Sequence, residues 1–300
     1  MTSCGQGAEN VHAAWRMAVA RRAAAEYAVS PGLAALAVAG SVGVGFADRF
    51  SDLELDCYWS RPPTEAERLA PVRSLGGELT ALWDYDQDDE EWSEDYRVGE
   101  LDITVSNFLV SAAERFLDDV VLRASTDPVR HMRLAAFQRS CPLLGAEMMA
   151  SWRTRAGEFP GDLVSALVEQ ALAPEVLRGW AAREALVSRG DGLAAGDLLA
   201  RAGYAVVRVV LALNRVYLPH RQLKWQRHLI AGLGLAPERL AERLESMSTS
   251  PLAEGLQTAE ALLTETAALA EAHSGADISG FREALSERRR AIDPPPMGQA

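Results

Sequence analysis

The segment from Gly40 to Asp56, GSVGVGFADRFSDLELD, constrains the fold more than any other part of the chain. It begins with a Gly-Ser pair that closes the apolar stretch 33–39, and ten residues separate this pair from Asp52. Asp52 and Glu54 alternate with leucines, which is the pattern of a strand with two carboxylates on one face and apolar side chains on the other. The segment therefore predicts a strand, a glycine turn and a second strand that presents acids to a pocket.

Two acids on alternate residues of a strand need an explanation, because Asp and Glu are depleted in strands. One explanation is an edge strand with a solvated face. The other is a metal site, since Mg²⁺ is usually held by one or two carboxylates while substrate phosphates fill its other positions. The preceding Gly40 and Ser41 favour the metal site, because glycine lets a backbone approach a phosphate closely and the serine hydroxyl can donate to it. Asp102 supplies a third acid, whereas Asp56 is interpreted as a structural acid deeper along the strand.

Hydrophobic periodicity predicts an α+β fold with an N-terminal mixed sheet, flanking helices and a C-terminal helical bundle. A helix is expected over 11–27, and further strands over 75–83 and 96–108, where Asp102 and Thr104 would share a face. From about residue 112 the chain changes to alanine- and leucine-rich helical stretches. We therefore expect a catalytic domain over 1–125 and a helical domain over 126–300.

Composition excludes several classes of function. The formal net charge is −12, which would repel nucleic acid, so no nucleic-acid partner is expected. The N-terminus lacks a basic segment followed by an apolar core, which predicts a cytoplasmic protein. The longest weakly polar run, 31–45, is too short to cross a bilayer, so no membrane segment is expected. A homo-oligomer is compatible with the sequence.

Lys224 is the only lysine among 30 basic Lys and Arg residues. A lysine supplies a compact point charge that can reach a phosphate or a leaving group, which the planar guanidinium of arginine does not reproduce. The alternative is one lysine retained by chance on a helix surface. Nearby, His220 is a candidate general base because its ordinary pKa lies near neutrality, although a histidine in a loop is more often incidental.

The run 84–95 contains eight acidic residues. Such a run usually forms a solvated loop. Its functional interpretation is a negative rim that attracts a cationic substrate to the cleft.

The Gly40-Ser41 pair, followed at this spacing by Asp52-Leu53-Glu54, resembles the signature of the DNA polymerase beta-like nucleotidyltransferases. The Asp-x-Glu variant and the Lys224-Trp225 pair are similar to features of the kanamycin-type aminoglycoside nucleotidyltransferases. The segment 214–225 also resembles a poorly characterised bacterial branch of that superfamily. In the kanamycin-type enzymes a glutamate precedes the lysine by one helical turn, whereas this chain has His220 there.

The resemblance implies a magnesium-dependent transfer of an NMP group from an NTP to a hydroxyl of a small molecule, with release of pyrophosphate. It implies that Asp52, Glu54 and Asp102 hold Mg²⁺ and that Lys224 neutralises charge on the phosphates. Gly40, Ser41 and Ser51 would bind the nucleotide, most plausibly ATP, as in an adenylyltransferase. Either Asp102 or His220 would take the acceptor proton.

The acceptor implied by the resemblance is an antibiotic or a biosynthetic metabolite, and the acidic run favours a cationic one. The alternative from another class is a non-catalytic nucleotide-binding or antitoxin-like regulatory protein with the same fold. Retention of all three candidate acids favours the enzyme.

Overall fold

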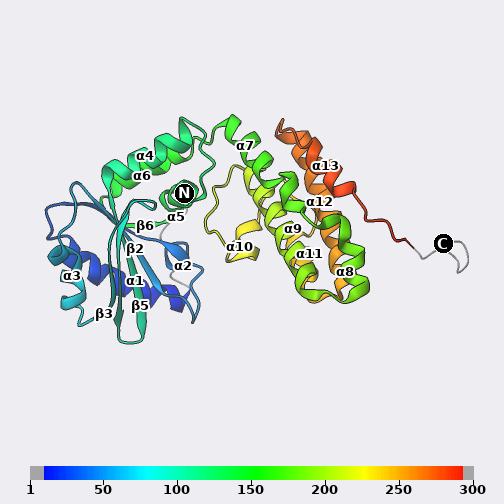
Figure 1. Ribbon diagram of the computed structural model, residues 1–300. Helices are drawn as coiled ribbons and strands as arrows, with labels where there is room; N and C mark the ends of the chain where they lie inside the picture. Colours follow the sequence, from blue (N-terminus) through cyan, green and yellow to red (C-terminus); the bar gives the residue numbers. More distant parts are fainter. Residues whose placement is uncertain (1–9, 293–300) are drawn as a thin grey trace, which may run out of the picture. The chain divides into compact units, whose positions relative to one another are not determined.

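The computed structural model describes residues 10–292, and the chain folds into two compact units. Among the described residues, the first unit consists of 10–160 together with 217–221, and the second of 161–216 together with 222–292. The α+β architecture with a helical C-terminal part, predicted from the sequence, is confirmed (Figure 1).

The first unit is built on one open sheet of six strands in the order β3-β4-β5-β2-β1-β6. The β2 and β5 strands are parallel and every other neighbouring pair is antiparallel, so the sheet is mixed, as predicted. The strands are β1 (Leu33–Val38), β2 (Leu53–Trp59), β3 (Glu78–Asp86), β4 (Glu91–Val98), β5 (Leu101–Leu109) and β6 (Cys141–Leu144).

Helices cover both faces of this sheet. They are α1 (Val11–Tyr27), α2 (Gly40–Gly43), α3 (Glu65–Ser74), α4 (Val110–Val121), α5 (Pro128–Arg139) and α6 (Ala146–Ala156). The α5 and α6 helices and the β6 strand belong to the first unit, which therefore extends to Pro160 rather than to the expected boundary at 125.

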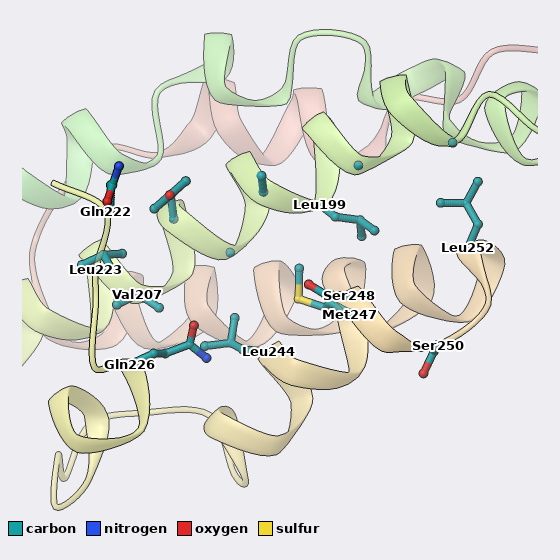
Figure 2. A pocket seen from close by; sticks show the side chains of 15 residues that line it. Leu199, Val207, Gln222, Leu223, Gln226, Leu244, Met247, Ser248, Ser250 and Leu252 are labelled. Carbon is teal, nitrogen blue, oxygen red and sulfur yellow. The ribbon is translucent and has the colours of Figure 1, made fainter. Parts of the chain in front are cut away.

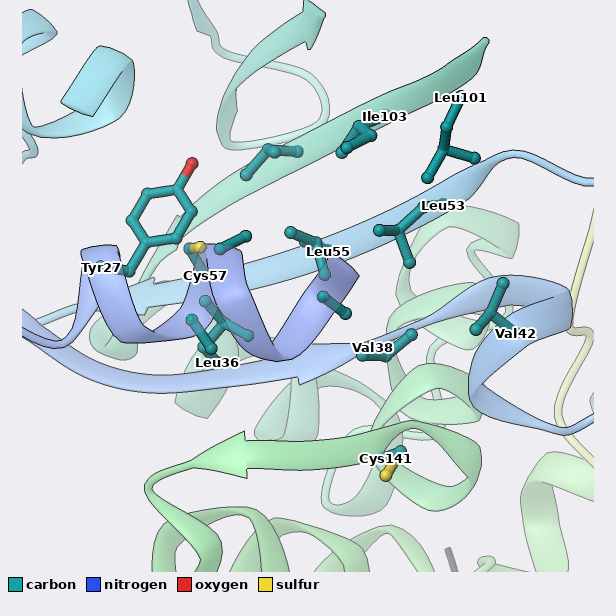
Figure 3. Packing of buried hydrophobic residues seen from close by; sticks show 14 of the residues in the cluster. Tyr27, Leu36, Val38, Val42, Leu53, Leu55, Cys57, Leu101, Ile103 and Cys141 are labelled. Atoms are coloured by element: carbon teal, nitrogen blue, oxygen red, sulfur yellow. The ribbon is translucent and has the colours of Figure 1, made fainter. Parts of the chain in front are cut away.

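The main core lies between α1 and one face of the sheet (Figure 3). Alanines of α1 allow the helix to approach closely, while alternate residues of β2, such as Leu53 and Leu55, fill the space beneath it. The opposite face of β2 carries Tyr58, whose ring packs edge-on against Trp152 of α6 at a centroid distance of 4.9 Å. Because both faces are covered over most of β2, an exposed side chain on this strand requires an opening between the helices.

A buried ion pair joins α3 to the sheet. Arg68 Nε donates to Glu94 Oε2 at 2.7 Å, and the Glu94 side chain is fully buried. The same carboxylate accepts from Asn107 Nδ2 at 3.0 Å and from the hydroxyl of Tyr27 at 3.3 Å. These hydrogen bonds satisfy a charge that would otherwise be costly to bury.

Two local predictions in this unit are wrong. The segment 96–108 is not one strand, because Gly99, with φ of +60°, forms a tight turn that separates β4 from β5. The acidic run 84–95 is not a solvated loop but the end of β3, a short turn and the beginning of β4. Its acids are compatible with a strand because several of them pair with arginines from the helices.

The second unit contains only helices among its described residues. In chain order they are α7 (Gly161–Ala171), η2 (Pro174–Leu177), η3 (Trp180–Ala182), α8 (Arg183–Arg189), α9 (Gly192–Leu213), α10 (Gln226–Ile230), α11 (Leu240–Thr249), α12 (Leu252–His273) and α13 (Ser279–Ser286). The long α9 packs against α7 and α12 and forms the centre of the bundle. Across residues 10–292, no helix combines the length and the apolar character needed to cross a membrane.

Candidate functional site

The glycine turn after β1 lies directly against the acidic strand. Gly40 has φ of +55°, and a Cβ at this position would lie 2.5 Å from Oε1 of Glu54. At Gly43 a Cβ would lie 2.2 Å from the carbonyl oxygen of Val38. Both positions therefore favour glycine, Gly40 because of its left-handed backbone and Gly43 because a Cβ would collide with the backbone of Val38. The turn brings the backbone around Gly40 and Ser41 next to a carboxylate.

The strand register places the predicted acids side by side. Glu54 on β2 pairs in parallel with Thr104 on β5, and Asp52 and Asp102 each immediately precede the paired residues Leu53 and Ile103. Asp52, Glu54 and Asp102 are all exposed. Because β2 lies between β1 and β5, an edge strand is not the reason for its two acids.

Asp102 already has a cationic partner. Arg97 on β4 donates from Nε to Asp102 Oδ1 at 2.8 Å, with the two side chains 50% and 65% exposed. This ion pair is exposed enough to exchange readily with solvent or with a ligand. The neighbouring Thr104 donates its hydroxyl to Asp95 at 2.8 Å.

The donor chemistry fits a magnesium ion in type, because the acids offer only oxygen ligands. Among residues 10–292, however, no three His, Cys, Asp or Glu side chains are gathered as a metal site. Two carboxylates on one strand face, Asp52 and Glu54, match a cation that takes its remaining ligands from substrate phosphates and water. Asp102 would join them only if it left Arg97.

Asn10, the N-cap of α1, and Arg16 within α1 hold the two ends of the loop before β2. Asn10 caps α1 through its side-chain oxygen and donates Nδ2 to the carbonyls of Gly45 and Ala47, at 3.1 and 2.8 Å. Arg16 donates to the carbonyl of Ser51 from Nε at 2.9 Å and from Nη2 at 2.5 Å. This guanidinium therefore holds the residue that directly precedes Asp52.

Charge around this loop is balanced locally. Arg16 is only 3% exposed, and burial lowers the pKa of its guanidinium, while Asp48 and Asp52 oppose that shift. Hydrogen bonds from the backbone of Phe50 and from Ser51 hold the pKa of Asp48 below its usual value. The hydroxyl of Ser51 is used in this turn, since it donates to Asp48 at 3.1 Å. Ser51 therefore shapes the loop, and its predicted role in nucleotide binding stays a prediction.

Replacing Arg16 by methionine is expected to destabilise the protein by about 1–3 kcal/mol, because the buried carbonyl of Ser51 loses its donors while an apolar stem remains. The proposed transfer activity should fall by more than the loss of folded protein explains, since Asp52 loses its support. Urea unfolding and activity at a temperature where the variant is fully folded would measure the two effects. Arg22→Met, on an exposed position of α1, is the matched control.

Asp56 is separate from the exposed acids. It is 5% exposed, and burial raises the pKa of its carboxyl, partly offset by the nearby guanidinium of Arg133. The Tyr58 hydroxyl donates to it at 3.4 Å. This environment agrees with the interpretation of Asp56 as a structural acid.

The remaining predicted residues lie in 214–225. The segment 217–221 packs on the first unit through Tyr217, whose ring stacks on Phe159 at 4.8 Å and contacts His131 at 5.5 Å. His220 is half-buried in this segment. Lys224 is exposed and belongs to the second unit. The structure therefore gathers the strand acids and the glycine turn in one unit, whereas it assigns Lys224 to the other.

Three of the eight acids in the run 84–95 pair with arginines. Glu90 contacts Arg130 at 2.7 Å and also pairs with Arg115, while Glu91 contacts Arg133 at 2.8 Å. Asp86 accepts from two backbone amides of its own turn. Support for a negative rim is therefore confined to the exposed acids near this turn.

Sequence reasoning missed the two residues that hold the loop. Asn10 could have been found, because an asparagine before an apolar-periodic segment is a helix N-cap signal. Arg16 carries no such signal, since it is one of several arginines on α1 and its role depends on contact with a residue 35 positions away.

Comparisons with known proteins add little to this description. No protein-family model matches the chain, and no curated protein sequence matches it. One solved structure with some likeness is a nucleotidyltransferase-like protein from Exiguobacterium sibiricum, at a TM-score of 0.39 and 14% identity, covering 87% of this chain and 75% of that chain. This likeness is too distant to support an argument about function.

Proposed function

We propose that this protein is a divalent-metal-dependent nucleotidyltransferase that moves an NMP group from an NTP to a hydroxyl of a small molecule. The observation that carries the proposal is the register of the acids. Glu54 on interior β2 and Asp52, directly before that strand, lie beside Asp102 on parallel β5, and the glycine turn at Gly40 approaches the Glu54 carboxylate. Exposed acids on an interior strand, next to a backbone able to approach phosphate, suit an anionic substrate bound through a cation.

In this proposal Asp52 and Glu54 would hold Mg²⁺, which supplies charge neutralisation and alignment for in-line displacement at phosphorus. The backbone around Gly40 and Ser41 would contact the phosphates, with Ser51 nearby in the loop. Asp102, released from Arg97, would complete the metal site or receive the acceptor proton, and His220 is the other candidate base.

The reaction balances without a further reactant. The acceptor oxygen forms a bond to the α-phosphorus, the bond from that phosphorus to the bridging oxygen breaks, and pyrophosphate leaves. The hydroxyl proton passes to the base and then to water. We propose ATP as the nucleotide, which would make the protein an adenylyltransferase. We also propose that it acts in the cytoplasm.

The acceptor is proposed to be an antibiotic or a biosynthetic metabolite. A cationic acceptor is supported only by the exposed acids of the β3–β4 turn, because Glu90, Glu91 and Glu94 pair with arginines. The structure therefore gives a cationic antibiotic no preference over a neutral metabolite.

The deciding experiment incubates the purified protein with each NTP and Mg²⁺ against a panel of antibiotics and metabolites while pyrophosphate release is followed. Acceptor-dependent release supports the enzyme. The Arg97–Asp102 ion pair instead favours a non-catalytic nucleotide-binding protein, in which Arg97 permanently occupies the third acid. That alternative predicts nucleotide binding without pyrophosphate release in the presence of every acceptor.

Lys224→Ala is expected to weaken transfer by roughly 1.5–3 kcal/mol, the size of a charge-assisted hydrogen bond, with little change in stability because the side chain is exposed. Lys224→Arg should restore activity only in part, since the fork cannot reproduce a point charge. The measurement is kcat/KM for the NTP together with thermal unfolding. Arg239→Ala, an exposed cation of the same unit, is the control. Unchanged kcat/KM in Lys224→Ala would show that the lysine is incidental.

A further inference from the structure

The second unit contains a cavity of about 510 Å³ among α9, α11, the segment 222–226 and the start of α12 (Figure 2). Its size lies within the range of pockets that hold small molecules, about 300–1,000 Å³. All of its lining residues belong to the second unit, so the cavity exists independently of the acidic strand.

One wall of the cavity is a row of residues on α9 that have little or no side chain. Gly192, Gly196, Ala200 and Gly203 line it from α9 at spacings of four, four and three residues, which places them on one helical face. A Cβ at Gly196 would meet no heavy atom within 4 Å. Packing therefore does not require glycine at position 196. The helical backbone does not require it either, because other residues stabilise a helix interior better than glycine does. Its absent side chain leaves the space open.

The middle of the cavity is apolar, whereas the amides of Gln222 and Gln226 and the hydroxyls of Tyr204, Ser248 and Ser250 also line it. Leu199, Val207, Leu244 and Met247 form the middle of the cavity, and all four are at least nine-tenths buried. Gln222 and Gln226 lie toward the same end of the cavity, on opposite sides of it, as Figure 2 shows. The amides can orient a ligand by hydrogen bonds, while the apolar middle supplies contact area.

No residue that lines the cavity is Lys, Arg, His, Asp or Glu. A charged ligand would lose part of its hydration there and would find no ionic partner among the lining residues. We propose that this cavity is a binding site for an uncharged small molecule of up to three rings that carries a hydrogen-bonding group. The site does not depend on the proposed nucleotidyl transfer.

The test uses two dyes with one ring skeleton, neutral N-phenyl-1-naphthylamine and its sulfonated relative 1-anilinonaphthalene-8-sulfonate, titrated into the full-length protein with fluorescence detection. The neutral dye should bind saturably at one per chain. Gly196→Leu should weaken this binding at least about tenfold, because the new side chain occupies the ligand's space. The unfolding temperature should stay equal or rise, since leucine is the better helix former.

Ala194→Leu, on a part of α9 that does not line the cavity, should bind the neutral dye as the unmodified protein does. Ser248→Phe fills the same space from the exposed surface of α11 and should repeat the loss if Gly196→Leu folds poorly. Binding of the sulfonated dye should not respond to either filling variant. Equal binding of the neutral dye before and after filling, equal loss in Ala194→Leu, or equal sensitivity of both dyes would overturn the proposal.

Discussion

Asp52→Asn is expected to reduce metal-dependent nucleotidyl transfer at least about a hundredfold, the loss typical of removing one preorganised electrostatic group. The amide keeps the shape of the side chain but removes the negative charge that would recruit the cation. Stability should change little, because Asp52 is exposed and precedes β2. The measurement is kcat/KM at saturating Mg²⁺, with pyrophosphate release as the readout.

Asp84→Asn is the matched control, since Asp84 is an exposed acid on the outer strand β3 and carries no proposed role at the metal. Its activity should equal that of the unmodified protein. Raising Mg²⁺ should partly restore a variant with a weakened metal site. Full activity of Asp52→Asn, or activity in excess EDTA, would contradict the assignment of Asp52 as a ligand.

Arg68→Met is expected to destabilise the first unit by about 3–5 kcal/mol, because it leaves the Glu94 carboxylate buried without a cation. Burial already raises the pKa of Glu94, and Arg68 is the main group that opposes this shift. Equilibrium unfolding in urea, followed by tryptophan fluorescence, would measure the change. The double variant Arg68→Met/Glu94→Gln should recover part of the loss, since a neutral amide costs less to bury.

Arg61→Met removes a cation from an ion pair that involves the same helix, where the Arg61 side chain is 45% exposed. It should cost no more than about 1 kcal/mol, as exposed pairs do. A loss in Arg68→Met no larger than in Arg61→Met would mean that water reaches Glu94. A double variant as unstable as the single one would mean that lost packing, rather than unpaired charge, causes the effect.

The sequence predicted the parts of the fold that depend on local pattern. The glycine turn and the alternation in 53–55 indicated a strand with exposed acids, and this strand, the mixed sheet and the helical bundle are present. The sequence predicted Asp102 on a later strand as a third acid, but its position beside Asp52, through the parallel pairing of β2 and β5, had to come from the structure.

Most of the failures come from contact between distant segments, and one comes from a local turn. The acidic run resembled a solvated loop because its cations come from elsewhere, with Arg68 on α3 and Arg130 and Arg133 on α5. A single strand over 96–108 was wrong because the alternation continues through the turn at Gly99. The support of the loop by Arg16 likewise joins residues that no local pattern connects.

The return of 217–221 to the first unit has a consequence for dissecting this protein into fragments. The chain passes between the units three times, so neither unit corresponds to one uninterrupted stretch of the gene. A product that stops at Pro160 would lack Tyr217 and would leave the ring faces of Phe159 and His131 that it covers open to water. A fragment that contains the first unit alone would therefore need 217–221 joined to residue 160 through a linker.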